Sequence, residues 1–195
     1  MPISRIVTAL SQHGYCVVSR FFFAESAELR ATLLQAWQTG GLTRAAVGQG
    51  PARQVRDAVR GDYVRWLEPS ADPAIQSYFQ AMETLRVAIN RELFMGLFDY
   101  EAHFALYPPG AFYQKHRDGF VGDKRRKVSC VLYLNDDWQP HQGGALRLYT
   151  PAGNIDISPQ AGTLACFLSD DMWHEVLPAT RERLSITGWF KIRGV

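Results

Sequence analysis

The chain has 195 residues, of which 47% are hydrophobic and 21% are charged, and its formal net charge is +2. This length and apolar content suit one globular domain with a sizeable core. The small net charge, with both signs interspersed, argues against nucleic acid or a membrane surface as a partner, because both attract concentrated basic patches.

No run approaches the roughly 18 apolar residues of a membrane span, and the first residues lack the apolar core of a signal peptide. We therefore expect a cytoplasmic protein. The three cysteines, Cys16, Cys130 and Cys166, form no Cys-x-x-Cys motif. The sequence thus predicts neither a zinc site nor a disulfide framework.

The first hundred residues are predicted to be mainly helical. The segment "SRIVTALSQ" has the spacing of a short amphipathic helix, and "GYCVVSRFF" follows as a strand. The segment "AESAELRATLLQAWQTGG" predicts a second helix, with Ser26 as its cap and Gly40 and Gly41 as its stop. The longest helix is predicted for "DPAIQSYFQAMETLRVAINRELFMGLF", which begins with Asp72 and Pro73.

Residues 40–66 lie between the second and third of these helices. They are polar and rich in glycine, which is typical of a long functional loop. We interpret them as a mobile flap that ends in a strand at residues 63–66.

From Glu101 onward, about seven short apolar segments alternate with breaks such as "PPG", "PAGN" and "PQAG". This pattern favours an antiparallel sandwich or jelly roll, with the helices packed on the outer face of one sheet. We therefore predict an α+β fold in a single domain, residues 1–195. Residues 1–100 form the helical support with the flap, and residues 101–195 form the jelly-roll (double-stranded β-helix) core.

His116 and Asp118 lie one residue apart in the aromatic stretch "YPPGAFYQKHRDGF". On a strand, residues i and i+2 point to the same face, so an imidazole would lie beside a carboxylate. A surface His–Asp pair is the alternative interpretation. His174 follows the apolar segment 163–168 and could equally be a satisfied core histidine.

The segment 183–190 alternates between an apolar and a polar face. Leu184, Ile186 and Phe190 share one face, and Arg183, Ser185, Thr187 and Trp189 share the other. Inside a closed roll, an arginine beside two hydroxyls needs an anion as its partner. The outward polar face of an edge strand is the alternative.

Taken together, these residues fit one chemistry. Two histidines and one carboxylate on one side of a metal leave three coordination positions open, as in non-haem Fe(II) oxygenases. A 2-oxo acid would fill two positions and dioxygen the third. The far carboxylate of 2-oxoglutarate would need a rigid, charged partner, which Arg183 offers.

The stretch from about residue 104 to residue 190 resembles the Fe(II)/2-oxoglutarate-dependent oxygenases of the prolyl 4-hydroxylase type. It is most similar to the hypoxia-inducible-factor prolyl hydroxylases and their bacterial relatives. The motifs that carry the resemblance are "LYPPGAFYQKHRD", "VSCVLYLNDDW", "GGALRLY" and "HEVLPATRERLSITGWF". The segment "VRGDYVRW" extends it into the flap.

The resemblance implies specific roles for the residues around the predicted metal. His116, Asp118 and His174 would be the iron ligands. The residues implied to contact 2-oxoglutarate are Arg183 and Tyr133 at its distal carboxylate, Tyr107 and Thr187 near the metal, and Leu146 and Val176 as apolar walls. Without the resemblance, a core tyrosine with a satisfied hydroxyl is the simpler interpretation of Tyr133.

The resemblance also implies a pocket for a prolyl ring. Tyr113, Trp189 and Trp66 would contact the pyrrolidine, whose C–H edges suit flat aromatic faces. Arg126 would lie at the pocket mouth and pair with Asp62 of the flap, which would couple substrate arrival to closure. Each aromatic residue could instead be ordinary core.

The chain departs from the animal members at His103, where they carry an apolar residue, and in a shorter linker before the ligands. His103 shares a strand face with Tyr107 and would edge the site. This departure leaves the substrate sequence preference open.

The implied reaction is the hydroxylation of a prolyl residue in a protein, coupled to decarboxylation of 2-oxoglutarate to succinate, with dioxygen as oxidant. Ascorbate would serve as a reductant, and elongation factor Tu is a candidate substrate. Two alternatives remain: an oxygenase of this family that acts on a non-prolyl or small-molecule substrate, and a non-catalytic, cupin-like metal-binding module.

Overall fold

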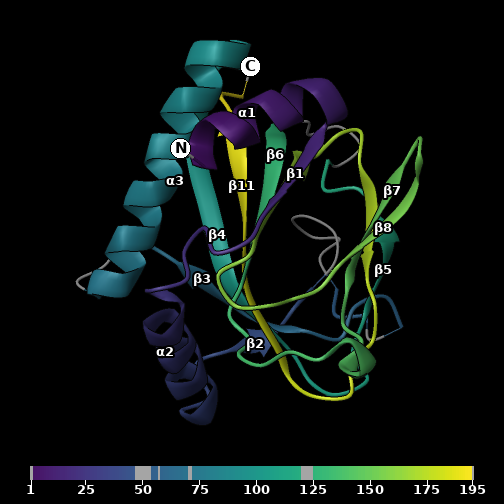
Figure 1. Cartoon of the computed structure of the whole chain (residues 1–195). Coiled ribbons are helices and arrows are strands. Elements are labelled where there is room, and N and C mark those ends of the chain that lie inside the picture. The colour runs from purple at the N-terminus through teal and green to yellow at the C-terminus, as the bar shows by residue number, and fades with distance from the viewer. Residues whose placement is uncertain (1, 47–53, 57, 70–71, 120–124, 195) are drawn as a thin grey trace.

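The computed structural model describes residues 2–46, 54–56, 58–69, 72–119 and 125–194. Two antiparallel sheets form a sandwich, and three helices cover the outer face of the larger sheet (Figure 1). The larger sheet has seven strands in the order β1-β9-β6-β11-β4-β3-β2, and the smaller has four in the order β5-β10-β7-β8. The predicted α+β jelly roll with helices on one sheet is confirmed.

The helices are α1 (Pro2–His13), α2 (Ser26–Gln38) and α3 (Pro73–Leu93), and η2 (Pro140–Gln142) is a short 3₁₀ turn. At the start of α3, the Asp72 carboxylate accepts hydrogen bonds from the backbone N–H groups of Ala74 and Ile75 and so caps the helix. Within the described residues, no helix is both long and apolar enough to cross a membrane.

Two helix ends differ from the predictions. Ser26 is the first residue of α2 rather than its cap, and its hydroxyl donates to the carbonyl of Phe23 instead of accepting from the helix. The third helix ends at Leu93, because Phe94 adopts a left-handed conformation (φ 54°). Of the remaining residues predicted as helix, 94–96 form a connection, and Leu97 and Phe98 belong to the next strand.

The larger sheet contains β1 (Tyr15–Val18), β2 (Thr43–Arg44), β3 (Tyr63–Leu67), β4 (Leu97–Tyr107), β6 (Arg126–Tyr133), β9 (Leu164–Leu168) and β11 (Arg183–Ile192). The smaller sheet contains β5 (Tyr113–His116), β7 (Leu146–Thr150), β8 (Gly153–Ile157) and β10 (Trp173–Val176). The seven strands predicted after Glu101 all form.

The alternation predicted for the last strand determines what each face of the larger sheet does. Leu184, Ile186 and Phe190 are buried in the main core, beneath the helices. On the opposite face, Arg183, Thr187 and Trp189 line a cavity between the sheets. One face of β11 therefore stabilises the fold, and the other is free to build a site.

The predicted flap is only partly within the described residues, because 47–53 and 57, including Gly48, Gly50 and Pro51, lie outside them. The predicted strand at 63–66 is confirmed as β3, which pairs with β4. The segment just before it is joined to β5: the N–H of Gly61 donates to the carbonyl of Phe112, and the N–H of Gln114 donates to that of Val59.

Candidate active site

A cavity of about 540 Å³ lies between the two sheets. Its walls combine residues of the flap, the larger sheet and the smaller sheet. All of the predicted site residues line it except Tyr133 and Asp62, which are fully buried directly behind the wall.

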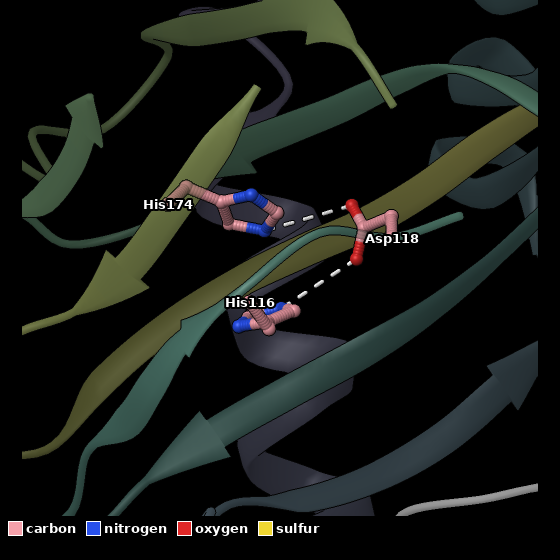
Figure 2. A group of neighbouring side chains, drawn as sticks. All are labelled: His116, Asp118 and His174. Carbon is pink, nitrogen blue, oxygen red and sulfur yellow. Dashed lines mark ion pairs between the residues drawn. The ribbon is translucent and has the colours of Figure 1, made fainter. Parts of the chain in front are cut away.

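His116, Asp118 and His174 meet at one end of this cavity (Figure 2). His116 ends β5 and is the register partner of His174 on the neighbouring strand β10. The Asp118 carboxylate faces both rings, with 3.6 Å from Oδ1 to His116 Nε2 and 3.6 Å from Oδ2 to His174 Nε2. The candidate ligand atoms all lie within 4.8 Å of one another, a distance that one cation can bridge.

The reason predicted for this convergence is wrong in one respect. His116 is the last residue of β5, and Asp118 lies in the bend that follows, so the two residues do not share a strand face. The carboxylate reaches the rings because the chain turns back over the end of the strand.

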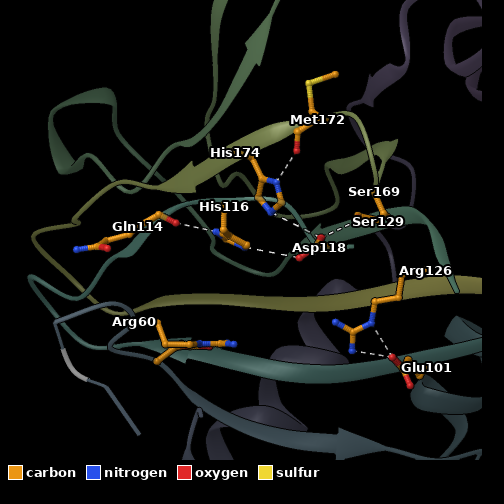
Figure 3. A network of polar contacts seen from close by, with 11 residues as sticks. Arg60, Glu101, Gln114, His116, Asp118, Arg126, Ser129, Ser169, Met172 and His174 are labelled. Atoms are coloured by element: carbon orange, nitrogen blue, oxygen red, sulfur yellow. Dashed lines mark hydrogen bonds and ion pairs between the residues drawn. The ribbon is translucent and has the colours of Figure 1, made fainter. Parts of the chain in front are cut away.

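Hydrogen bonds hold each of the three side chains in place (Figure 3). The Nδ1–H groups of His116 and His174 donate to the carbonyls of Gln114 (2.7 Å) and Met172 (3.1 Å). Each Nε2 therefore keeps its lone pair for a metal, as is typical of metal-ligating histidines. The hydroxyl of Ser129 donates to Asp118 Oδ2 at 2.6 Å.

The electrostatics of the cluster favour the metal-binding protonation states. Burial alone would raise the pKa of Asp118, but the positive charge that His174 carries when it is protonated at acid pH, the neighbouring His116 and the hydrogen bond from Ser129 hold that pKa well below its usual value. Burial lowers the pKa of His174 to about 4. A carboxylate and a neutral imidazole are the forms that bind a divalent cation.

The opposite end of the cavity holds a buried arginine. Arg183 is 1% exposed; its Nε donates to the carbonyl of Gly144 at 2.8 Å and its Nη1 to Ser185 Oγ at 3.4 Å. Within the described part of the chain, Arg183 Nη2 and the hydroxyl of Tyr133 have no hydrogen-bond partner. Buried donors without a partner are costly, so this end fits a carboxylate that accepts from both.

The two tyrosines beside Arg183 remain protonated at neutral pH. Burial raises the pKa of Tyr133 to about 12 and that of Tyr107 further still. The guanidinium carbon lies 5.1 Å from the centre of each ring. Tyr107, which was expected near the metal, is thus in contact with Arg183, its register partner on β11. Thr187, Leu146 and Val176 line the cavity between this end and the metal-ligand cluster. A molecule with one carboxylate near Arg183 and a chelating group near the cluster therefore fits the cavity.

Aromatic rings line the cavity beside the cluster. The ring of Tyr113 stacks on that of His116, with centroids 3.6 Å apart. Trp66 and Trp189 lie next to each other, with centroids 6.3 Å apart, and Trp66 is 47% exposed. The three aromatic residues predicted to contact substrate thus line one cavity.

The predicted ion pair between Arg126 and Asp62 is not what the structure shows. Asp62 forms a two-pronged pair with Arg60. Arg126 pairs with Glu101 at 2.7 Å (Figure 3). The guanidinium of Arg126 also lies 3.7 Å from the centre of the Trp189 ring. Asp62 is therefore buried against Arg60 on the flap, and Arg126 lines the cavity next to Glu101.

Two further residues, Ser129 and Arg60, contact the predicted site residues. Ser129 lies in an apolar strand and orients Asp118 through a hydrogen bond. Its pairing with Trp189 on β11 puts it on the cavity face, and this pairing could not be known from the sequence. Arg60 lies over the ring of Tyr113 at 4.4 Å. Arg60 lies two residues from Asp62 in the sequence, and this closeness could have indicated that the two residues pair.

The model of the 2OG-Fe(II) oxygenase superfamily matches residues 102–191. Egl nine homolog 1 of Mus musculus is 32% identical over 203 residues, which cover 97% of this chain and 50% of the mouse protein. The human protein of the same name is also 32% identical, over 46% of its length. The chain thus spans about half the length of these curated relatives.

A solved prolyl-4-hydroxylase of Pseudomonas putida is 46% identical, with a TM-score of 0.92 over 98% of this chain and 100% of that one. A prolyl hydroxylase of Trichoplax adhaerens, solved with a hypoxia-inducible-factor peptide, is 27% identical, with a TM-score of 0.89 over 97% of this chain and 89% of that one. This chain belongs to the 2OG-Fe(II) oxygenase superfamily, and its cavity fits Fe(II) and 2-oxoglutarate, the two cofactors after which the family is named.

Proposed function

We propose that this protein is a prolyl 4-hydroxylase, which couples the oxidative decarboxylation of 2-oxoglutarate to the hydroxylation of a prolyl residue in a protein. One observation carries the proposal. A two-histidine, one-carboxylate cluster and an unsatisfied arginine–tyrosine pair lie at opposite ends of one cavity with aromatic walls. The similarity to the Pseudomonas putida prolyl-4-hydroxylase supports it.

The metal-ligand cluster and Arg183 bind different cofactors. His116, Asp118 and His174 hold Fe(II), and Arg183 with Tyr133 binds the far carboxylate of 2-oxoglutarate. When bound, the iron and 2-oxoglutarate together activate dioxygen, with succinate and carbon dioxide as coproducts.

The protein's own side chains orient the reactants. Ser129 and the carbonyls of Gln114 and Met172 fix the three ligand side chains in place. The buried guanidinium of Arg183 fixes the direction of the cosubstrate, with Tyr107 and Thr187 beside it. Leu146 and Val176 keep water from that part of the cavity.

The substrate side of the cavity suits a pyrrolidine ring. Tyr113, Trp66 and Trp189 present flat faces, and a prolyl side chain offers only C–H edges to them. Arg60 holds Tyr113 and is itself held by Asp62, so the flap sets the position of one aromatic wall. Arg126 supports Trp189 in the same way.

We also propose a substrate, a cellular compartment and a reductant for this enzyme. The Trichoplax adhaerens relative was solved with a peptide of a protein, which supports a protein substrate here. Elongation factor Tu is the candidate we put forward. We further propose that the enzyme acts in the cytoplasm and that ascorbate keeps its iron reduced.

The test is incubation of the purified protein with Fe(II), 2-oxoglutarate and lysate of its host cells, followed by a proteome-wide search for prolyl residues that have gained one oxygen atom. We expect hydroxyproline and succinate with the wild-type protein and neither with Asp118→Ala. Succinate with oxidation confined to other residues or to small molecules would support an oxygenase of different substrate class. Absence of succinate would favour a non-catalytic metal-binding module.

A further inference from the structure

Two buried ring nitrogens in the cavity wall have no role in the site described so far. Within the described residues, His103 Nδ1 and Trp189 Nε1 have no hydrogen-bond partner. The two side chains are 4% and 5% exposed, and both residues line the cavity. Buried polar atoms without a partner are rare in folded proteins, because each has given up its hydrogen bonds to water. A ligand is the natural partner for such a pair.

The two rings lie side by side on the larger sheet. His103 is the register partner of Thr187 on β11 and of Trp66 on β3. Trp189 is two residues beyond Thr187 and so faces the same side of the sheet. The ring centroids of His103 and Trp189 are 5.3 Å apart, and that of Trp66 is 5.0 Å from His103. The pair therefore belongs to the aromatic, substrate-facing wall.

Both nitrogens can act as hydrogen-bond donors. The indole Nε1–H has no acceptor lone pair, so it can only donate. Burial, together with the charge of Arg60, lowers the pKa of His103 to about 4, so its ring is neutral near pH 7. A neutral imidazole carries one N–H, and its Nδ1 tautomer places that donor on the unpartnered nitrogen.

A prolyl residue presents the matching chemistry. Proline has no backbone N–H, so its backbone offers carbonyl oxygens only, and these are acceptors. A wall with two donors and an aromatic surface would bind such a group and reject a residue that needs an acceptor for its own N–H.

We propose that His103 Nδ1 and Trp189 Nε1 donate hydrogen bonds to a backbone carbonyl oxygen of the target prolyl residue, and that this pair determines the register of the substrate in the cavity. The inference rests on the proposed function and deepens it. Trp66 contacts both rings and is about half exposed, so it lies between the pair and solvent.

Binding of a minimal probe tests the pair without turnover. The protein is loaded with Zn(II) in place of iron and with 2-oxoglutarate, and N-acetyl-L-prolinamide is titrated in. The indole Nε1–H resonance of Trp189 is followed by NMR and is assigned through its loss in Trp189→Phe. We expect a saturable shift of that resonance as the hydrogen bond forms.

His103 is tested by paired substitutions. His103→Leu keeps the approximate volume and loses the donor, so the Kd of the probe should rise about tenfold, the effect of one hydrogen bond. His103→Asn keeps a donor near the Nδ1 position, and its Kd should stay within about threefold of wild type. His103→Met replaces the leucine variant if that variant does not fold. The affinity for 2-oxoglutarate should be unchanged in each.

The outcomes separate this inference from the proposed function. The absence of a saturable shift, or an equal Kd in wild type and the apolar variant, overturns the donor pair even if hydroxyproline is found in the lysate experiment. A saturable shift with the expected order of affinities supports the pair. If hydroxyproline is then absent from the lysate, the proposed reaction fails while the carbonyl-binding pair stands.

Discussion

Arg183 is a buried cation with no ion pair to any carboxylate among the described residues. Its Nε and Nη1 are satisfied by Gly144 and Ser185, and its Nη2 is left for a ligand. The neighbouring hydroxyl of Tyr133 is unsatisfied as well. Because a buried charge is stabilised only by a partner, the site as it stands is incomplete without an anion.

Replacing Arg183 should therefore affect the cosubstrate more than the metal. We expect Arg183→Ala to raise the Kd of 2-oxoglutarate by about tenfold to a hundredfold, the effect of lost hydrogen bonds to a charged group. The Kd of Mn(II), used as a stand-in for iron, should change little. Isothermal titration calorimetry measures both.

The matched control is Arg147→Ala. Arg147 also lies on a strand of the roll, but it pairs with Asp156 at the surface. It should leave both constants at their wild-type values. An unchanged 2-oxoglutarate affinity in Arg183→Ala would mean that the cosubstrate does not bind at this end of the cavity.

At the scale of elements, Asp72 shows how one residue can fix a helix and its neighbour. Its carboxylate caps α3 and also accepts a hydrogen bond from the hydroxyl of Thr32 on α2 at 3.0 Å. Both helices pack on the same face of the larger sheet. The cap therefore contributes to the support on which the site is built.

Asp72→Ala should lower the free energy of unfolding by about 1–2 kcal/mol, the usual cost of losing a cap. Asp72→Asn keeps an acceptor for the helix N–H groups and should cost less than half of that. Urea denaturation followed by circular dichroism gives both values. Equal losses in the two variants would show that the charge of Asp72, rather than its cap, is what stabilises the helices.

The elements that could be predicted from sequence were those with strong local signals. The Asp-Pro pair predicted the start of α3, and the alternation of β11 predicted two different faces; both are present. Ser26 was a poorer guide, because its hydroxyl satisfies the carbonyl of Phe23 rather than the helix. Local sequence does not reveal which of two nearby backbone groups a hydroxyl will choose.

The site residues whose type implies a particular chemistry could be predicted from the sequence. The ion-pair partners could not, because tertiary contacts alone determine them. His116, Asp118 and His174 are of types that bind divalent metals, and Arg183 is a buried cation that needs an anion, so their types were informative. The partners of Arg126 and Asp62 were not predicted: Arg126 pairs with Glu101 on β4, and Asp62 pairs with Arg60 on its own segment. Tertiary packing decides which opposite charge such a side chain meets.

At the scale of the molecule, the two sheets contribute different residues to the site. The helices cover one face of the larger sheet, which leaves its other face to the cavity (Figure 1). The larger sheet supplies Arg183 and the tryptophans, and the smaller sheet supplies His116 and His174. The site therefore exists only when the two sheets are packed together.

Glu101 joins three strands of the larger sheet and should make stability depend on pH. Burial would raise its pKa, but Lys191 on β11 and Arg126 on β6 hold it below its usual value. A carboxylate with a depressed folded pKa stabilises the protein above its unfolded pKa of about 4.3 and loses that effect as the pH falls through the folded pKa.

Glu101→Gln should therefore be less stable than wild type by about 1 kcal/mol at pH 7, with a difference that shrinks below about pH 4. Glu83→Gln is the control, because Glu83 pairs with Arg86 at an exposed helix surface and should cost only a few tenths of a kcal/mol. Urea titrations at several pH values measure the difference. A deficit that grew toward low pH would contradict the assigned ion pairs.

The central claim is that His116, Asp118 and His174 bind one ferrous ion in the same cavity in which Arg183 binds 2-oxoglutarate. Anaerobic titration with Fe(II) and 2-oxoglutarate tests it through the visible absorption band that a chelated 2-oxo acid gives with ferrous iron. We predict a band that saturates at one equivalent of iron, is absent in Asp118→Ala, and needs more 2-oxoglutarate in Arg183→Ala. No band with the wild-type protein, or an undiminished band in Asp118→Ala, would contradict the account.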